Sequence, residues 1–387
     1  MALSLPWDGL GYRWRNGSGR AVSGAHRAVD ALRSMRLDGL ASHTATGELS
    51  VGCQGLAEGI RLTLPFLEER REPHAGPVAR RVPTRASWRD VGVTGGPDAP
   101  DLLIVVGPTG KVARLPTRHA LLLPFRLSLQ VPVGHGVSPV RRVSAKDRGH
   151  YRRQRQRRDW TLERATAVAD FDYFYDRMHR PTMDRRHGAA ARSERRGSAY
   201  SSIFRNGALF FLRDSGSRVA GMLCRWEPAH RKLVIRLAGV LDGDVAHYRS
   251  GVSMAMYIEV LEWAARHRMD VVDLGGCEPF LSKGTFQFKR KIHPEVSLPA
   301  NHWAQQRIWL GARRDSGLLR DFLVSNPPVS IDGEGQLRAV YFHDRDRSPR
   351  DDLRWQTPGL AEPRFVHLDE FLAGAPRTGQ ARRREYQ

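Results

Sequence analysis

The sequence predicts a mixed α/β fold, in which a meander of antiparallel strands is followed by a helix and one further strand. Two observations predict it. Short apolar runs of strand length, separated by glycine, proline and charged turns, recur across residues 207–244. A helical periodicity follows, because Met254, Ile258, Leu261 and Ala265 are spaced so that they share one face of a helix.

The length and composition indicate a soluble protein of two domains. The chain has 387 residues, 41% of them hydrophobic. No apolar run reaches the roughly 18 residues that a membrane-spanning helix needs. The first residues lack the pattern of a secretory signal, so we expect a cytoplasmic location. Cys53, Cys224 and Cys277 are too few and too scattered for a disulfide framework or a zinc site, so no metal is expected.

The positive charge of the chain has two explanations that the sequence leaves open. The formal net charge is +21, which favours polyanionic partners such as nucleic acid. However, only six of the 62 Lys+Arg residues are lysines. A general compositional bias toward arginine would produce the same positive charge without any functional role. Lysines in unusual places therefore deserve more weight than arginines.

The first part of the chain predicts an α/β unit over residues 1–140. Residues 1–95 show no clear pattern, but the run LLIVV at 102–106 reads as a buried strand ended by Gly107 and Pro108. Residues 119–133 predict one or two more strands, with a bend at Pro124.

A basic segment and a second unit follow, over residues 141–315. Residues 141–160 carry nine Lys+Arg against two Asp, which is typical of either a solvated helix between domains or a phosphate-binding surface. Residues 161–180 predict an amphipathic helix.

The elements after residue 180 predict the sheet of this second unit. Three antiparallel strands are expected, then a helix to about residue 268, a strand, a second helix and a last strand. The strands are expected at 208–214, 218–227, 232–244, 271–276 and 295–310. Residues 316–387 are expected to be an extension with a basic tail.

This order of elements resembles the GNAT superfamily of acyltransferases, and in detail its Fem-like branch with tandem GNAT-like units. The resemblance rests on Asp273-Leu274-Gly275-Gly276, then Lys283-Gly284, then Phe288-Lys289. It implies a central mixed sheet whose two parallel strands splay apart to hold an acyl donor, with the first N–H groups of the following helix facing phosphate.

The resemblance implies that the donor lies at the start of the helix that follows the meander. Candidate donor-binding residues are Tyr248, Arg249, Ser250, Gly251 and Ser253. The segment Arg249–Ser253 is one residue shorter than the pattern of acyl-CoA-dependent members. A plain helix start capped by Ser250 or Ser253 is the alternative.

The remaining candidates concern catalysis and the acceptor. Asp273, Glu278 and His187 are candidate catalytic residues, although Asp273 also fits a turn aspartate that caps the Gly275–Gly276 loop. Lys283, Lys289 and Arg186 are candidate phosphate- or acceptor-binding residues, and the alternative for the two lysines is a solvated basic helix face.

The sequence thus predicts an enzyme, an N-acyltransferase with no tightly bound cofactor. The first hypothesis is transfer from a thioester co-substrate, acyl-CoA or an acyl-carrier protein, to an amine of a small molecule or of a cell-envelope precursor such as that of peptidoglycan. The second is transfer from aminoacyl-tRNA, with residues 141–160 contacting the tRNA. The third is a non-catalytic module with the same fold that binds nucleic acid.

Overall fold

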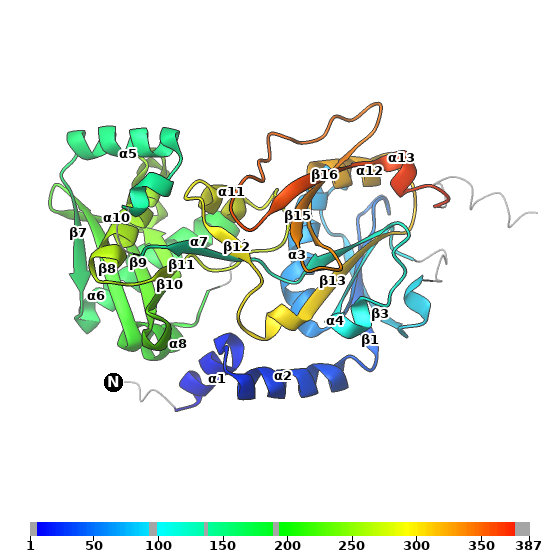
Figure 1. The fold of residues 1–387 in the computed structure, drawn as a ribbon, viewed down its shortest axis with the longest axis horizontal. Coiled ribbons are helices and arrows are strands. Elements are labelled where there is room, and N and C mark those ends of the chain that lie inside the picture. Colours follow the sequence, from blue (N-terminus) through cyan, green and yellow to red (C-terminus); the bar gives the residue numbers. More distant parts are fainter. Residues whose placement is uncertain (1–5, 93–98, 135–137, 189–192, 376–387) are drawn as a thin grey trace, which may run out of the picture. The chain divides into compact units, whose positions relative to one another are not determined.

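The computed structural model describes residues 6–92, 99–134, 138–188 and 193–375. Its chain forms two compact units that interleave in sequence (Figure 1). Unit 1 comprises Met1–Gly17, Ser128–Gly276 and Phe288–Val296, and unit 2 comprises Ser18–Leu127, Cys277–Gln287 and Ser297–Gln387. None of the helices in the described ranges combines the length and the apolar character needed to cross a membrane.

The described part of unit 1 is built on a seven-stranded mixed sheet in the order β12-β6-β11-β10-β9-β8-β7. Strands β7 to β10 form the antiparallel meander, and β11 then pairs with β10 in the parallel sense. The strands are β6 (Ser128–Pro132), β7 (Trp160–Ala165), β8 (Gly207–Asp214), β9 (Ser217–Glu227), β10 (Lys232–Val240), β11 (Val271–Asp273) and β12 (Glu295–Ser297).

Helices cover both faces of this sheet. On one face Trp263 of α10 packs against Phe210 and Trp226. On the other face Phe211 and Leu223 join an apolar cluster with the π-helical segment η3, because successive strand residues point to opposite faces. The helices of unit 1 include α1 (Pro6–Asn16), α5 (Ala145–Arg157), α6 (Val168–Tyr173), η3 (Phe174–His179), α7 (Arg180–His187), α8 (Arg196–Ser198), η5 (Ala199–Ile203), α9 (Val245–Arg249) and α10 (Val252–Arg266).

Unit 2 contains two sheets within its described residues. The larger has the order β3-β1-β2-β4-β13-β5, with β2 and β4 parallel, and the smaller has the order β14-β15-β16. The strands are β1 (Leu37–His43), β2 (Val51–Gly55), β3 (Arg80–Ala86), β4 (Leu102–Pro108), β5 (Ala120–Pro124), β13 (Gln306–Ala312), β14 (Val329–Ile331), β15 (Leu337–His343) and β16 (Ala361–His367).

The helices of unit 2 include α2 (Arg20–Arg33), α3 (Ala57–Ala75), α4 (Thr109–Val112), α12 (Gly317–Ser325) and α13 (Leu368–Phe371). Helices α3, α12 and α13 contribute to one large apolar cluster, which includes Leu64, Phe66, Ile104 and Phe322, and Val112 of α4 belongs to a second cluster. Helix α11 (Gly284–Arg290) contains residues assigned to both units.

The units do not coincide with the contiguous ranges 1–140, 141–315 and 316–387 expected from the sequence. Strand β6 directly follows β5 in the chain but pairs with β11 in the sheet of unit 1. Strand β13 follows β12 but pairs with β4 and β5 in unit 2. Each sheet therefore receives a strand from a segment that adjoins the other unit in sequence.

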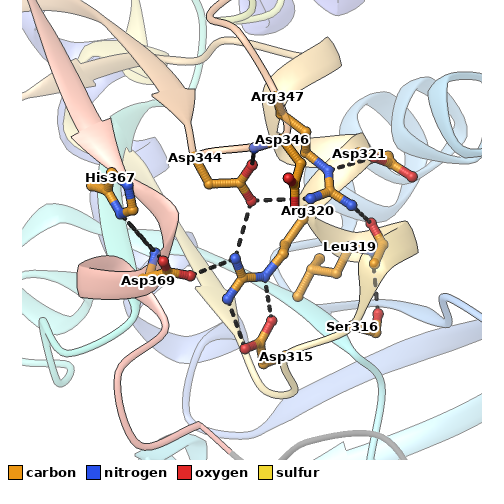
Figure 2. Close-up of polar contacts among 11 residues, drawn as sticks. Asp315, Ser316, Leu319, Arg320, Asp321, Asp344, Asp346, Arg347, His367 and Asp369 are labelled. Carbon is orange, nitrogen blue, oxygen red and sulfur yellow. Dashed lines mark hydrogen bonds and ion pairs between the residues drawn. The ribbon is translucent and has the colours of Figure 1, made fainter.

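Residues 316–375 are an integral part of unit 2, and an ion-pair network ties them together (Figure 2). The Arg320 guanidinium of α12 donates to Asp315 at 2.7 Å, to Asp344 at 3.0 Å and to Asp369 at 2.6 Å. Arg347 donates to Asp344 at 3.0 Å and to Asp321 at 2.6 Å. Asp344, with a side chain 4% exposed, is the carboxylate that both guanidiniums share.

The predicted mixed α/β class is confirmed, as are the meander and the helix that joins it to a parallel strand. Two element predictions are wrong. Residues 160–165 form strand β7 at the edge of the sheet rather than the start of a helix. Residues 295–310 hold two strands, β12 and β13, separated by a 3₁₀ turn at His302–Gln305.

Candidate active site

The two parallel strands of unit 1 diverge after a short stretch of pairing. β10 has nine residues, but it pairs with β11 only from Lys232 to Val234. After Asp273 the chain turns away, and the Leu274 N–H donates to the carbonyl of Leu129 in β6 at 2.9 Å. The second half of β10 therefore has an edge that β11 does not cover, as the resemblance led us to expect.

A β-bulge lies at the point where the strands diverge. The register between β10 and β9 shifts between Ile235 and Leu237, which leaves Arg236 as the extra residue. A bulge leaves backbone groups outside the regular ladder and increases the local twist of the strand. Both effects favour the opening of β10 away from β11.

The corresponding parallel pair of unit 2 is closed. β2 pairs with β4 along all its residues, from Val51 to Gly55. At Gly55 (φ 104°) an added Cβ atom would lie 2.0 Å from the carbonyl oxygen of Val106, so the two backbones touch. No space remains between these strands for a donor, and the divergence in unit 1 is the better candidate site.

Helix α10 follows the meander in the chain, and a histidine lies against its N-cap residue. Gly251, the N-cap, has φ 86°, and no side chain caps the helix in the described structure. The alternative of a helix start capped by Ser250 or Ser253 is thus wrong, and Ser250 Oγ instead donates to the His247 carbonyl at 2.8 Å. A Cβ added at Gly251 would lie 2.6 Å from His150 Nε2. The imidazole of His150 occupies the space that glycine leaves open.

The structure brings two further candidates together near this helix start. The Arg186 guanidinium lies 3.8 Å from the centre of the Tyr248 ring, a close cation–π contact. Arg249 is exposed and makes no ion pair with any residue that the structure describes. His187 ends α7, but its side chain is outside the described part, so its catalytic role stays a prediction.

Asp273 has the structural role that was its alternative. Its Oδ1 accepts a 2.8 Å hydrogen bond from the Gly275 N–H, which shapes the turn after β11. Its Oδ2 accepts from Gln130 at 3.3 Å and lies 4.0 Å from the Lys232 ammonium. These contacts give the carboxylate a role in holding the turn, and its catalytic role stays a prediction.

Lys289 belongs to the same turn. Its ammonium donates to the Gly275 carbonyl at 3.2 Å, and the residue is only 6% exposed. The alternative of a solvated basic helix face is therefore wrong for Lys289. In α11 it lies three residues after the buried Phe286, which puts both on one face of the helix.

Glu278 and Lys283 form an ion-pair group in unit 2. Glu278, with a side chain 8% exposed, accepts from Arg126 at 2.9 Å and lies 3.5 Å from the Lys283 ammonium. That ammonium also lies 4.9 Å from the centre of the Phe66 ring. Lys283 precedes α11 and is not on a solvated helix face. Asp273 and Glu278 belong to different units.

A polar groove of about 630 Å³ lies in unit 1 between α5, α10 and the 3₁₀ segment η2 (Pro139–Arg142). Figure 1 shows α5 and α10 on the same unit. Four arginines and two glutamates are among the lining residues, which are Ser138, Val140, Arg141, Tyr151, Arg152, Arg155, Gln156, Glu259, Glu262 and Arg266.

The glutamates at this groove already have hydrogen-bond partners. The Tyr151 hydroxyl donates to Glu259 at 2.5 Å, and burial together with that carboxylate raises the pKa of Tyr151 above its usual range. Arg155 lies 3.8 Å from Glu259, and Ser138 donates to Glu262. Arg141, Arg152 and Arg266 make no ion pair within the described residues, so the groove presents net positive charge.

Sequence reasoning missed His150, and it pointed to the groove only through the basic segment 141–160. His150 is in the basic segment 141–160, but its contact with Gly251 joins residues 101 positions apart and leaves no local pattern. The groove had one signal, since α5 carries six basic residues and buries only Tyr151. A helix so polar on every side is not held by apolar burial alone, which favours a role at its surface.

No family model matches the chain, and no curated protein matches it. Solved structures of similar shape include FemX (10% identity, TM-score 0.39, covering 70% of this chain and 83% of that one). They also include L-PGS from Bacillus licheniformis (12%, 0.36, 83% and 96%). A GCN5-related N-acetyltransferase from Anabaena variabilis matches as well (10%, 0.27, 78% and 70%). TM-scores this low do not define an activity, and the α/β fold rests on the strand pairing above.

Proposed function

We propose that the protein is a GNAT-type acyltransferase that forms an amide, with its reaction centre where β10 and β11 of unit 1 diverge. The main observation behind this proposal is that β11 pairs only with Lys232–Val234 of β10, and that a bulge at Arg236 follows soon after this paired stretch. An extended donor can add by backbone hydrogen bonds to the part of β10 next to Arg236. Further along the strand the Ala238 carbonyl contacts His179 Nδ1 at 3.0 Å and the Val240 N–H donates to Thr182 Oγ1 at 3.0 Å.

The chemistry needs few side chains. An acceptor amine attacks the donor carbonyl, a C–N bond forms, and the C–O or C–S bond to the carrier breaks. The proton lost by the amine ends on the leaving oxygen or sulfur. Backbone N–H groups beside the bulge are suited to stabilise the oxyanion, because they are fixed before the reaction. Positioning of the two substrates supplies much of the remaining rate enhancement.

The donor that the geometry favours is an aminoacyl-tRNA. The imidazole of His150 fills the space at Gly251 where a CoA pyrophosphate would approach the start of α10. A tRNA ester needs no pyrophosphate site. The groove beside α5, with Arg141, Arg152 and Arg266, offers cations for an RNA backbone.

A thioester donor is the second candidate, and one observation favours it. The first amide N–H groups of α10 have no side-chain cap in the described structure, so they are available to phosphate if His150 moves. The acceptor in either case is an amine, of a small molecule or of a cell-envelope precursor.

The test supplies both donors to the full chain in parallel. Transfer RNA charged with labelled amino acids and labelled acetyl-CoA are each incubated with a panel of amines, and base-stable amide product is measured. A His150→Ala variant is included. We expect product from aminoacyl-tRNA, and no gain in the variant with acetyl-CoA.

Each other outcome has a defined meaning. Product from acetyl-CoA alone, raised by His150→Ala, makes the thioester the donor. RNA binding without product from either donor supports the non-catalytic module instead. If neither donor gives product and neither binds, the acyltransferase proposal fails.

A further inference from the structure

A second cavity lies in unit 1, at helix α1. Its volume is about 250 Å³, and its lining comes from α1 and from the segment that leads into β8, together with β9. The lining residues are Gly9, Leu10, Tyr12, Arg13, Ser201, Ser202, Asn206 and Arg225. This face of the sheet is not the one that α10 covers, since Arg225 and Trp226 are consecutive strand residues and Trp226 contacts α10.

The lining has the chemistry of an oxyanion site. It holds two guanidinium groups, a phenol, two hydroxyls and an amide, and no carboxylate is among the lining residues whose side chains the structure describes. Arg225 uses one N–H group on the carbonyl of Ser202, which fixes the direction of its guanidinium and leaves further donors. Arg13 is exposed and makes no ion pair with any described residue.

Tyr12 connects this cavity to the bulge of β10. Its ring is 5% exposed and lies between two guanidiniums, 4.6 Å from that of Arg225 and 5.2 Å from that of Arg236. Burial raises the pKa of the Tyr12 phenol, so it stays a hydrogen-bond donor at neutral pH. Nε of Arg236 is buried and has no hydrogen-bond partner within the described structure.

An ion pair fastens α1 over the cavity. Glu194 accepts from Arg15 of α1 at 3.1 Å and from Arg236 at 3.3 Å. Because α1 supplies four of the lining residues, the cavity exists only while α1 is docked. Ligand binding and α1 docking must therefore stabilise each other.

We propose that this pocket binds a small oxyanion, a phosphate group or a carboxylate of a ligand, between Arg13 and Arg225, and that binding fastens α1 on unit 1. The inference goes beyond the proposed acyl transfer, because it concerns a site of its own on the other face of the sheet. A phosphate group is the better fit, since the donors come from several directions around the cavity.

The test is hydrogen exchange of residues 9–16 in the full chain, with sodium phosphate, sodium acetate or sodium chloride at equal ionic strength. We expect phosphate to slow exchange in this helix about tenfold relative to chloride. Arg13→Gln and Arg225→Gln should each abolish the effect. Arg164→Gln is the matched control, because Arg164 stacks on Trp226 and Trp263 at about 6 Å on the opposite face.

The outcomes separate the possibilities. Protection by acetate equal to that by phosphate identifies a carboxylate ligand and supports the site. Protection that survives Arg13→Gln, an exposed position where substitution does not threaten folding, overturns it. So does exchange that is the same in phosphate, acetate and chloride.

Discussion

The ammonium group of Lys289 donates a 3.2 Å hydrogen bond to the carbonyl oxygen of Gly275, which precedes it by 14 residues. The bond joins α11 to the turn where β11 leaves β10. Gly275 has φ 78° in this turn, a conformation that suits glycine. Lys289 and Asp273 thus hold the two polar backbone groups of Gly275, one its carbonyl and the other its N–H.

Replacing Lys289 by Met should loosen this turn. A hydrogen bond from a charged group contributes about 1.5–3 kcal/mol, so we expect the free energy of unfolding to fall by about 1–2 kcal/mol. For amide formation, we expect kcat to fall by a larger factor than KM rises, because the turn sets the divergence of the strands and does not bind substrate. Urea unfolding and steady-state kinetics measure the two effects.

Lys291→Met is the control for that substitution. Lys291 has a side chain 44% exposed and pairs with Asp147 at 3.3 Å, so its loss should cost less than about 1 kcal/mol. Lys289→Arg should not restore the wild-type kinetics, because a planar guanidinium does not fit a site shaped for an ammonium. Equal effects at positions 289 and 291 would contradict a specific role for Lys289.

The sequence predicted this region in part, and the limits are physical. The run ending in Asp273 predicted the strand, and Gly275-Gly276 predicted the turn, because both are local patterns. The scarcity of lysine singled out Lys289, but its burial depends on a tertiary contact with Gly275. The resemblance assigned this lysine to a phosphate, and the structure places it on a backbone carbonyl.

Strand pairing was the least predictable feature. Apolar runs predicted strands at 102–106 and 119–133, but no local signal says that β5 and β6 separate at Leu127 into different sheets. In residues 160–165 buried and exposed side chains alternate only weakly. The strand pattern in the sequence was therefore faint, and the helical pattern of the residues that follow determined the prediction. The cation–π pair of Arg186 and Tyr248 joins two predicted residues that the sequence had assigned to different roles.

Gly251→Ala should destabilise unit 1 for two separable reasons. At φ 86° an alanine is strained by about 1–2 kcal/mol. Its Cβ atom would also lie 2.6 Å from His150 Nε2. In a His150→Ala background only the backbone strain remains, so the loss on adding Gly251→Ala should be smaller. Urea unfolding of the four proteins gives the two contributions, and equal losses in both backgrounds would mean that the imidazole does not crowd this position.

Arg320→Met should be the most damaging of the charge substitutions in unit 2. It leaves Asp344, which is 4% exposed at the side chain, with Arg347 as its remaining guanidinium partner. Removing one member of a buried ion pair costs about 3–5 kcal/mol, and the remaining partner should reduce this to about 2–4 kcal/mol. Arg350→Met is the control, since the Arg350–Asp352 pair is largely exposed. Thermal unfolding measures both losses of stability. Equal losses in the two variants would contradict a stabilising role of the Arg320 network.

The same network predicts how stability depends on acid. Burial raises the pKa of the Asp344 carboxyl, but hydrogen bonds from Arg320 and Arg347 outweigh this and lower the pKa below its usual range. A lowered folded-state pKa stabilises the protein above the unfolded value, about 3.9, and this contribution disappears as the pH falls through the folded value. Stability should therefore fall below about pH 4. Asp344→Asn should make that fall shallower, and an unchanged pH profile in this variant would exclude Asp344 as a source.

Substitutions in the groove beside α5 test whether the net charge of +21 serves RNA binding or only reflects the arginine-rich composition. Each phosphate contact adds about 0.7 to 0.9 to the slope of log affinity against log salt. Replacing Arg141, Arg152 and Arg266 by Gln should therefore weaken binding of deacylated tRNA and reduce this slope by about 2–3. Fluorescence anisotropy over a range of salt concentrations measures both.

The matched control removes the same charge from elsewhere, by replacing the exposed Arg20, Arg27 and Arg36 by Gln. If binding depends on the groove, this control keeps the wild-type slope, because RNA contacts at a defined site are lost only with the residues that make them. If both triple variants weaken binding equally, affinity follows net charge alone, and the arginine content is compositional. In that case the groove no longer supports aminoacyl-tRNA as the donor. The contact of His150 with Gly251 is then the one feature within the described residues that favours aminoacyl-tRNA over a thioester.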